Sequence, residues 1–141
     1  MPSTPIDRMT ATLDFQAAAL SLQAQRAKVL ASNIANADTP NYRAKDFDFG
    51  QALTQATQAT TQTQSAAAVA RTHPAHLSAA GTVAPAPVLQ YRQPLQAALD
   101  GNTVDLDTER AAFAESSVRY EATLRFLNGQ IKTMLTAING Q

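Results

Sequence analysis

Apolar residues recur at alternating steps of four and three along both ends of this 141-residue chain. Such spacing puts them on one stripe of an α-helix and is typical of a coiled-coil seam. The N-terminal stripe is mostly alanine with some leucine, whereas the C-terminal stripe carries large side chains, so the two can interdigitate. The sequence therefore predicts a mainly α fold in which two long terminal helices pair as an antiparallel coiled coil. The predicted seam consists of Leu13, Ala17, Leu20, Ala24, Ala27, Ala31 and Ile34 in the first helix, and of Phe113, Ser117, Tyr120, Leu124, Leu127, Ile131, Met134 and Ile138 in the second.

Each helix also carries apolar side chains away from the seam. Phe15, Leu22 and Val29 step by seven residues, and they lie about 200° around the first helix from the seam, at ~100° per residue. One partner helix cannot cover two nearly opposite faces, so this column is buried either inside a monomeric bundle or between subunits. A lone helix pair with such surplus apolar surface is marginal, which favours neighbouring subunits. The predicted intersubunit contacts are Phe15, Leu22, Val29, Val118, Phe126 and Leu135.

A turn-rich motif ends the first helix, which is predicted over residues 1–36. Asn36 suits the left-handed residue that closes a helix. Pro40 prevents continuation and pre-sets a turn with Asn41 after it. Residues 37–49 are predicted to form this turn and a short extended segment, with Tyr42, Phe47 and Phe49 as docking side chains. The helix-stop motif comprises Asn33, Asn36, Thr39, Pro40, Asn41 and Tyr42.

Residues 50–102 differ in kind from the two ends. They begin as a Gln/Thr/Ala low-complexity run and continue as a stretch rich in proline and small residues. Because such a segment buries little apolar surface, it is predicted to be poorly ordered, with transient helix and at most short extended segments. His73 and His76 lie here without a nearby Cys, Asp or Glu. They make an incomplete zinc shell and suit a surface or turn role, so no metal or cofactor is predicted.

The last region, residues 103–141, holds the second long helix. A turn is predicted over residues 100–102, after which Asp105 or Asp107 can cap a helix. The helix is predicted over about residues 106–138, where the apolar periodicity is cleanest, and Asn139 with Gly140 ends it.

Composition and charge argue against several functions. The formal net charge is zero, without a basic tail, which argues against nucleic acid as the main partner. There is no cysteine, so disulfides and thiolate zinc sites are excluded. No secretory signal and no membrane-spanning apolar run is visible. The carboxylates of Asp105, Asp107 and Glu109 fall at a helix start, where capping explains them, and no nucleophile, base or phosphate loop accompanies them. The chain is therefore not expected to be an enzyme.

Two blocks of the sequence resemble the bacterial flagellar basal-body rod protein family, and within it the proximal rod proteins. SNIANADTPNYRAKDFDF, residues 32–49, is similar to the family's Asn-x-Ala-Asn helix end followed by Thr-Pro-Gly-Tyr. Asn41 stands where the family usually has Gly, and Asn tolerates left-handed geometry. Residues 91–135, which include DGNTVDLDTE, resemble the C-terminal block of the same proteins. Together the blocks cover about half the chain, including both terminal helices.

The resemblance implies a structural subunit of the rod, the drive shaft that transmits torque from the membrane ring to the hook. It implies export by the flagellar type III apparatus without a cleaved signal, and assembly across the periplasm by coiled-coil packing of the terminal helices. Implied partners are copies of the chain, other rod proteins, and membrane-ring and rod-adaptor proteins at the rod base. Nucleic acid and direct membrane insertion are not implied.

Two other functions compete with this interpretation. The first is a chaperone-like or adaptor coiled coil that stays in the cytoplasm. The second is a helix lying on a membrane surface, but the N-terminal helix has few cations beyond Arg8, Arg26 and Lys28 to form a basic face.

Overall fold

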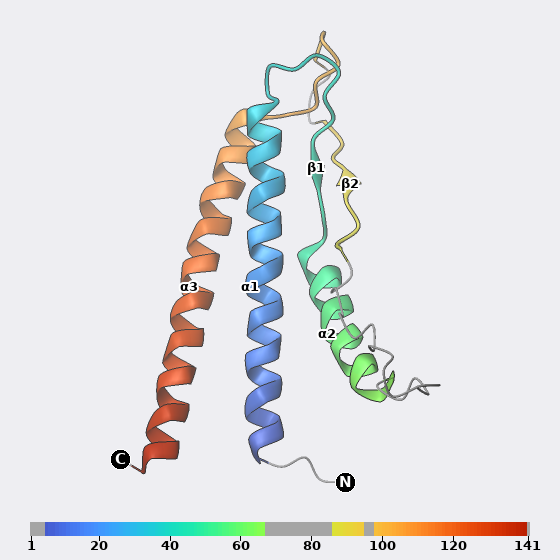
Figure 1. Cartoon of the computed structure of the whole chain (residues 1–141). Helices are drawn as coiled ribbons and strands as arrows, with labels where there is room; N and C mark the ends of the chain where they lie inside the picture. Colours follow the sequence, from blue (N-terminus) through green and yellow to red (C-terminus); the bar gives the residue numbers. More distant parts are fainter. Residues whose placement is uncertain (1–4, 67–85, 95–97, 141) are drawn as a thin grey trace, which may run out of the picture.

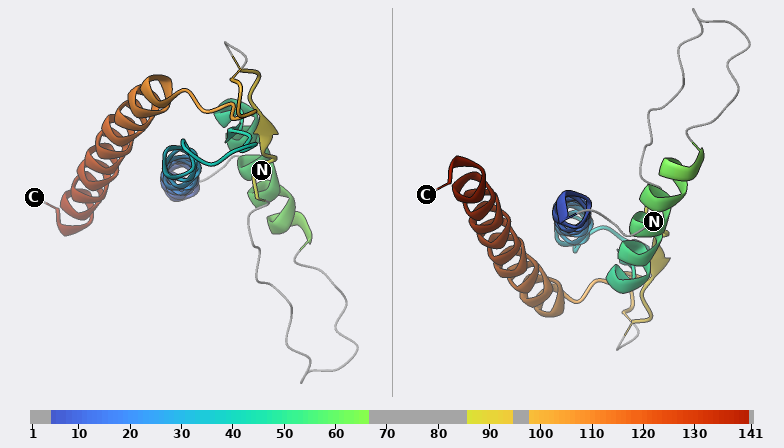
Figure 2. Two further views of the ribbon diagram at one scale, coloured as in Figure 1. Left: turned by 90° about the horizontal axis from the view of Figure 1, so that it is seen from above. Right: turned by 90° about the horizontal axis from the view of Figure 1, so that it is seen from below.

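The fold is built around one long helix with partners on two opposite sides. In a computed structural model, residues 5–66, 86–94 and 98–140 are described. The elements are α1 (Pro5–Ala35), β1 (Lys45–Asp46), α2 (Phe49–Ala66), β2 (Gln90–Tyr91) and α3 (Leu106–Asn139). Figure 1 shows α1 between α3 on one side and α2 with the two strands on the other. The predicted pairing of the two terminal helices is confirmed: α3 runs back along α1 in the opposite direction, and obliquely to it (Figure 2).

The ends of α3 follow the sequence signals. The Asp105 side chain accepts hydrogen bonds from the backbone N–H groups of Asp107 and Thr108, at 3.1 and 3.3 Å, so Asp105 is the N-cap. A further bond from the Thr108 hydroxyl and those backbone donors lower the pKa of Asp105. Gly140 closes the other end at a left-handed φ of 70°. A carboxylate at the start and a left-handed glycine after the end are favourable for any helix.

A short antiparallel ribbon covers part of α1. Lys45 of β1 lies opposite Tyr91 of β2, and Asp46 lies opposite Gln90. One further backbone bond, from the Arg92 N–H to the Ala44 carbonyl at 2.9 Å, continues the pairing. The Lys45 ammonium also lies 5.8 Å from the centre of the Tyr91 ring. The ribbon therefore brings the chain back from the middle region to the level of the α1 end.

Helix α2 is an addition to the architecture expected from the sequence, which allowed only transient helix there. Its start is fixed by Asp48, whose carboxylate accepts from the Gln51 N–H at 2.9 Å. Ala52 and Ala56, one turn apart, are buried with Leu22 and Phe47 in the main hydrophobic cluster. Alanine is a strong helix former, and its small side chain lets α2 approach α1 closely. Because these alanines lie in a low-complexity Gln/Thr/Ala run, the sequence pattern did not reveal this packing face.

The α2 contact corrects one sequence-based assignment. Leu22 is 4% exposed, and Val29 packs against the same cluster. Both were assigned to contacts between subunits, but the chain's own α2 and Phe47 cover them. Of that column only Phe15, at 49% exposed, keeps a free surface.

The α1–α3 contact is narrower than the predicted seam. Along α3 the buried residues are Glu109 and Ser116, and Leu127 and Met134 are partly buried. The contact also includes a polar bond, from the Gln23 amide to the Thr123 hydroxyl at 3.1 Å. Several large seam residues of α3 are instead substantially exposed, namely Phe113, Tyr120, Leu124, Ile131 and Ile138. One α1 helix is thus too thin to cover the apolar face of α3.

Within the described ranges, no helix has the length and hydropathy needed to cross a membrane. The same residues contain no cluster of three His, Cys, Asp or Glu side chains arranged to hold a metal ion. His73 and His76 lie outside the described residues.

Candidate assembly site

The helix-stop motif forms a buried junction centred on Asn33. Its side chain is fully buried and uses both of its polar atoms. The Nδ2 atom donates to the Lys45 carbonyl at 2.7 Å and to Glu109 Oε2 at 3.1 Å. The Oδ1 atom accepts from the Lys45 N–H at 3.1 Å and from the Tyr42 hydroxyl at 3.3 Å. Asn33 therefore pairs with the backbone of β1 as a neighbouring strand would, and it also holds the first turn of α3.

The end of α1 is closed in a different way from that expected. Asn36 does not adopt left-handed geometry; among the residues with described backbone, Asn41, at φ 60°, is the one non-glycine residue with positive φ. Asn36 instead donates from Nδ2 to the Ser32 carbonyl at 2.8 Å, and its Oδ1 accepts from the Thr39 hydroxyl at 3.2 Å. Its side chain closes the helix, and the left-handed turn comes at Asn41, as the substitution for the family's Gly predicted.

Asn102, from the second block, completes the junction. Its buried Nδ2 atom is shared among the carbonyls of Asn36, Ala37 and Thr39 at 3.0, 2.7 and 3.0 Å. These carbonyls follow the last turn of α1, and those of Asn36 and Thr39 also accept from the backbone N–H groups of Thr39 and Tyr42. The sequence pattern predicts only a turn at Asn102. Residue spacing alone cannot predict that the amide of a residue in the second block binds backbone carbonyls of the first block.

Two arginines and two carboxylates lie beside Asn33. Arg26 of α1 binds Asp46 through two bonds of 3.3 and 3.2 Å. Arg92 binds Asp46 with one arm and Glu109 with the other, the latter at 2.9 Å. Burial by itself would raise the pKa of Asp46, but the bonds from Arg26, Arg92 and the Phe47 N–H together lower it. The cluster ties α1, the ribbon and α3 together with balanced charge.

The predicted seam residues divide between covered and open surfaces. Leu13, Leu20 and Ile34 of α1 are partly buried, as are Leu127 and Met134 of α3. The remaining α3 members form a half-exposed apolar face. Among the predicted intersubunit contacts, four are exposed on the surface of the chain, between 49% and 69%: Phe15, Val118, Phe126 and Leu135.

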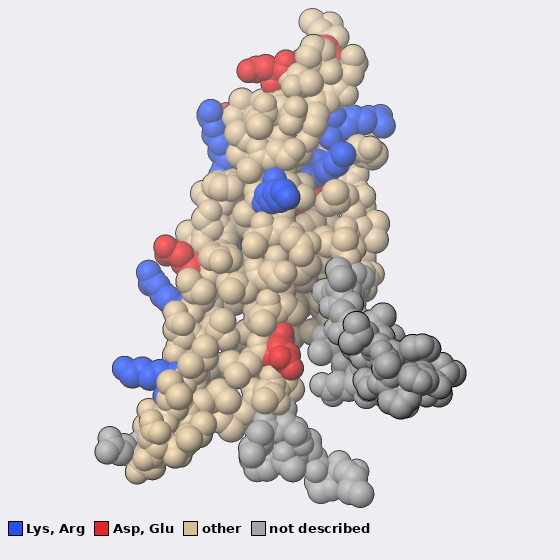
Figure 3. All heavy atoms as spheres, in the orientation of Figure 1, with Lys and Arg blue, Asp and Glu red and all other residues tan. Residues whose placement is uncertain are grey.

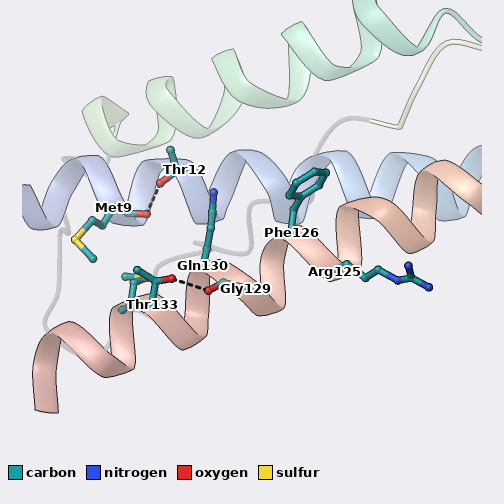
Figure 4. Close-up of a pocket in the computed structure, with 8 residues that line it drawn as sticks. Met9, Thr12, Arg125, Phe126, Gly129, Gln130 and Thr133 are labelled. Carbon is teal, nitrogen blue, oxygen red and sulfur yellow. Dashed lines mark hydrogen bonds between the residues drawn. The ribbon is translucent and has the colours of Figure 1, made fainter. Parts of the chain in front are cut away.

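A groove of about 400 Å³ opens where the N-terminal half of α1 faces the C-terminal half of α3. Figure 4 shows its lining, with Arg125 reaching away from the other side chains. Gly129 leaves the floor open, because no atom lies within 4 Å of the Cβ that another residue would add. The lining consists of Met9, Thr12, Arg125, Phe126, Gly129, Gln130, Thr133 and Met134. The groove is lined mainly by apolar and hydroxyl-bearing side chains, and its lining contains no pair of acidic and basic groups that could catalyse a reaction.

Charge on the visible face of the molecule is scattered. Figure 3 shows isolated Lys, Arg, Asp and Glu side chains separated by uncharged surface. This face therefore lacks the basic stripe that marks nucleic-acid binding. The features that stand out are instead a buried polar junction at one end of the helix pair and apolar surface along α3.

The chain is similar in sequence to known structural proteins of one class. A family model described as "Flagella basal body rod protein" matches residues 13–43, which cover most of α1 and the helix-stop motif. The flagellar basal body rod protein FlgB of Escherichia coli (strain K12) is 47% identical over 133 residues, 94% of this chain and 96% of that protein. FlgB of Salmonella typhimurium (strain LT2) is 44% identical over 135 residues, 96% of this chain and 98% of that protein. FlgB of Cereibacter sphaeroides is 42% identical over 129 residues, 92% of this chain and 94% of that protein. The chain therefore belongs to the FlgB family of flagellar basal body rod proteins.

Proposed function

We propose that the chain is a structural subunit of the proximal rod, which transmits torque from the membrane ring to the hook without catalysing a reaction. Its terminal helices assemble by packing with those of neighbouring subunits. The observation that carries this proposal is the apolar surface of α3, where Val118 and Phe126 are each 69% exposed. Several exposed large apolar side chains on one helix mark association. Membership of the rod family supplies the assembly in which it would be covered.

The junction gives the subunit a fixed shape. Asn33 and Asn102 hold residues that follow α1 against the start of α3, and the arginine–carboxylate cluster fastens the ribbon beside them. Residues 37–66 consequently leave α1 in one direction and lie on the face opposite α3 (Figure 1). A subunit built in this way offers α3 on one side and its ribbon and α2 on the other. A drive shaft needs such rigidity, because torque passes only through parts that do not yield.

The partners and location follow from the same proposal. Copies of the chain and other rod proteins cover the helical surfaces, and membrane-ring and rod-adaptor proteins contact the rod base. The chain reaches the periplasm through the flagellar type III export apparatus, without a cleaved signal peptide. Intersubunit contacts are assigned to Phe15, Val118, Phe126 and Leu135, which are exposed in the single chain.

Replacing Phe126 tests this function directly. The gene for the chain is replaced in its own bacterium by one that encodes Phe126→Asp, and basal bodies are isolated. Because Phe126 makes little use of its ring inside the chain, Phe126→Asp should leave the protein stable but abolish its incorporation and swimming. Asn128→Asp, an exposed neighbour on α3, is the matched control. A Phe126→Asp chain that enters basal bodies at the normal level would contradict the proposed contact, and an unaltered chain absent from basal bodies would contradict the function.

A further inference from the structure

Helix α3 leaves one continuous stripe of large apolar side chains without a partner. The stripe lies beside the line of Glu109, Ser116 and Leu127 that faces α1. At ~100° per residue its members fall within a sector of about 60°. Their exposed fractions range from 37% to 77%. This α3 stripe consists of Phe113, Tyr120, Leu124, Ile131, Leu135 and Ile138. The apolar face of α3 is therefore wide enough for two helices, and α1 occupies one of the two positions.

Helix α1 exposes a complementary stripe of small side chains. Ala17, Ala24 and Ala31 are seven residues apart, Ala35 follows one turn later, and all four are exposed. The heptad spacing predicts that the first three belong to the seam toward α3. In the structure α1 bonds to α3 through Gln23 and Asn33, and it packs against α2 through Leu22. This α1 alanine stripe is left as a third, smooth face.

We propose that the α3 stripe of one copy packs on the α1 alanine stripe of the next copy. Each α3 then lies between two α1 helices, its own and its neighbour's. The inference rests on the proposed function and names the pair of surfaces that joins adjacent copies. Large side chains on one helix and alanines on the other allow the two helices to approach closely. Because the two surfaces differ, the contact is heterologous and can repeat from copy to copy.

The direction of the contact follows from repetition. If all copies point the same way along a common axis, the α3 of one copy runs antiparallel to the α1 of the next, as it does to its own α1. One register then places Phe113 opposite Ala35, Leu124 opposite Ala24, and Ile131 opposite Ala17. The intervals match because eleven and then seven residues separate the members on both helices. Each of these three large residues therefore lies opposite an alanine.

Charges beside the two stripes fit the same direction and register. Asp14 lies within two residues of the position opposite Lys132, and Lys28 lies within one residue of the position opposite Glu121. All four side chains are exposed. In an antiparallel pair, residues displaced to the same side of both stripes face each other, and these four are displaced in that way. Opposite charges at matching positions select register and direction more than they add affinity.

The size of the stripes sets how strong one contact can be. Covering them removes on the order of 500 Å² of apolar surface per copy, less than the roughly 800 Å² per partner of a standard stable interface. A single contact between two copies is therefore weak, and it becomes stable only when it repeats around an array. This agrees with a chain whose apolar stripes stay exposed when it is alone.

Disulfide cross-linking tests the pairing, and the chain suits it because it has no cysteine of its own. An Ala24→Cys chain is mixed at high concentration with a Leu124→Cys chain and oxidised. Because a disulfide requires Cα atoms within ~7 Å, the mixed dimer should exceed each same-chain dimer by at least about fivefold. Ala17→Cys mixed with Ile131→Cys should behave in the same way. Ala17→Cys mixed with Leu124→Cys, displaced by seven residues, is the mismatched control and should give little product.

The outcomes separate the contact from the proposed function. Equal yields from matched and mismatched pairs, no mixed product, or a predominance of Leu124→Cys dimers with themselves would overturn the pairing. The same two chains are also expressed together in cells, and basal bodies are examined after oxidation. Mixed dimers in solution from chains absent from basal bodies would keep the contact and reject the proposed function. Chains present in basal bodies without mixed dimers would reject the contact and keep the function.

Discussion

Asn33 near the end of α1 donates a 3.1 Å hydrogen bond to Glu109 in the first turn of α3, across 76 residues of sequence. Both side chains are almost completely buried, at 0% and 1% exposed. Buried polar groups of this kind are costly unless every atom is paired. Here Glu109 is also bound by Arg92, and Asn33 is also bound to the Lys45 backbone. The two family-like blocks of the sequence therefore form one structural unit, and neither is complete without the other.

Replacing Asn33 by alanine should destabilise this unit strongly. The Asn33→Ala chain leaves the Lys45 N–H and one Glu109 oxygen buried without that partner, so a loss of ~2–4 kcal/mol is expected. Urea unfolding followed by circular dichroism measures it. Asn128→Ala, an exposed substitution on α3, is the matched control and should change stability by less than ~0.5 kcal/mol. Equal midpoints for the two variants would show that the Asn33 bonds contribute nothing.

Acid should weaken the ribbon through Asp46. The pKa of this carboxyl is lowered from 3.8 in the folded chain, so the unfolded chain binds its proton more readily. The stability that Asp46 contributes is therefore complete above about pH 4 and is lost as pH falls through the lowered folded value. Asp46→Asn should unfold more easily at neutral pH and lose less further stability between about pH 4 and pH 2.5. Unfolding curves across that range measure both effects, with Asp38→Asn, an exposed carboxylate, as control. An acid slope identical in Asp46→Asn and the unaltered chain would contradict this role.

Removing Asn102 should loosen the end of α1 specifically. Its amide serves three carbonyls that follow the last helical turn, so Asn102→Ala is expected to cost ~1–3 kcal/mol. Asn102→Asp should cost more, because it directs an acceptor at three other acceptors. Amide hydrogen exchange at Asn36, Ala37 and Thr39 should accelerate in both variants, relative to amides in the middle of α1. Asn139→Ala, at the far end of α3, should leave those three rates unchanged; if it accelerates them equally, the effect is not local to Asn102.

The sequence predicted the long elements well because their signals are local. Heptad spacing located α1 and α3, and Asp105 with Gly140 marked the ends of α3 through capping chemistry that acts within a few residues. Helix α2 was not predicted as a stable element, because its packing face is made of Ala52 and Ala56 and depends on Leu22 and Phe47 elsewhere in the chain. That dependence also explains the assignment of Leu22 to a subunit interface. Periodicity finds an apolar column but does not tell which segment covers it.

The junction was predicted only in part for a similar reason. The motif around Asn33 and the left-handed turn at Asn41 follow from residue type and from the family resemblance. Glu109 binds Asn33 and Asn102 binds the end of α1, and both come from the other block. From the sequence alone they are explained as a residue at a helix start and a turn residue. Arg26 was noted in the sequence only as a cation of the first helix, and Asp46 and Arg92 were given no role. Polar contacts between residues far apart in the sequence have no periodic pattern, so they cannot be predicted from the sequence in the way a helix can.

Gly101 and Asn41 should show the closeness of the two blocks most directly. Gly101 has a φ of 71°, and a Cβ added there would lie 2.7 Å from the Asn41 Oδ1 atom. Asn41 in turn donates its N–H to the Asp100 carbonyl at 2.9 Å. Gly101→Ala therefore combines backbone strain with a clash, and it should lower the free energy of unfolding by ~1–3 kcal/mol.

A double-mutant cycle separates the two causes. Asn41→Gly suits the left-handed backbone at φ 60° and should change stability by less than about 1 kcal/mol, whereas in the double variant it removes the side chain that the new methyl group meets. The double variant should then recover the part of the Gly101→Ala loss that comes from the clash, leaving the part that comes from the positive φ. Urea unfolding of the four chains gives the coupling energy. Strictly additive effects would mean that the turn relaxes away from Asn41, and that the two blocks are less tightly joined than the hydrogen bonds between them indicate.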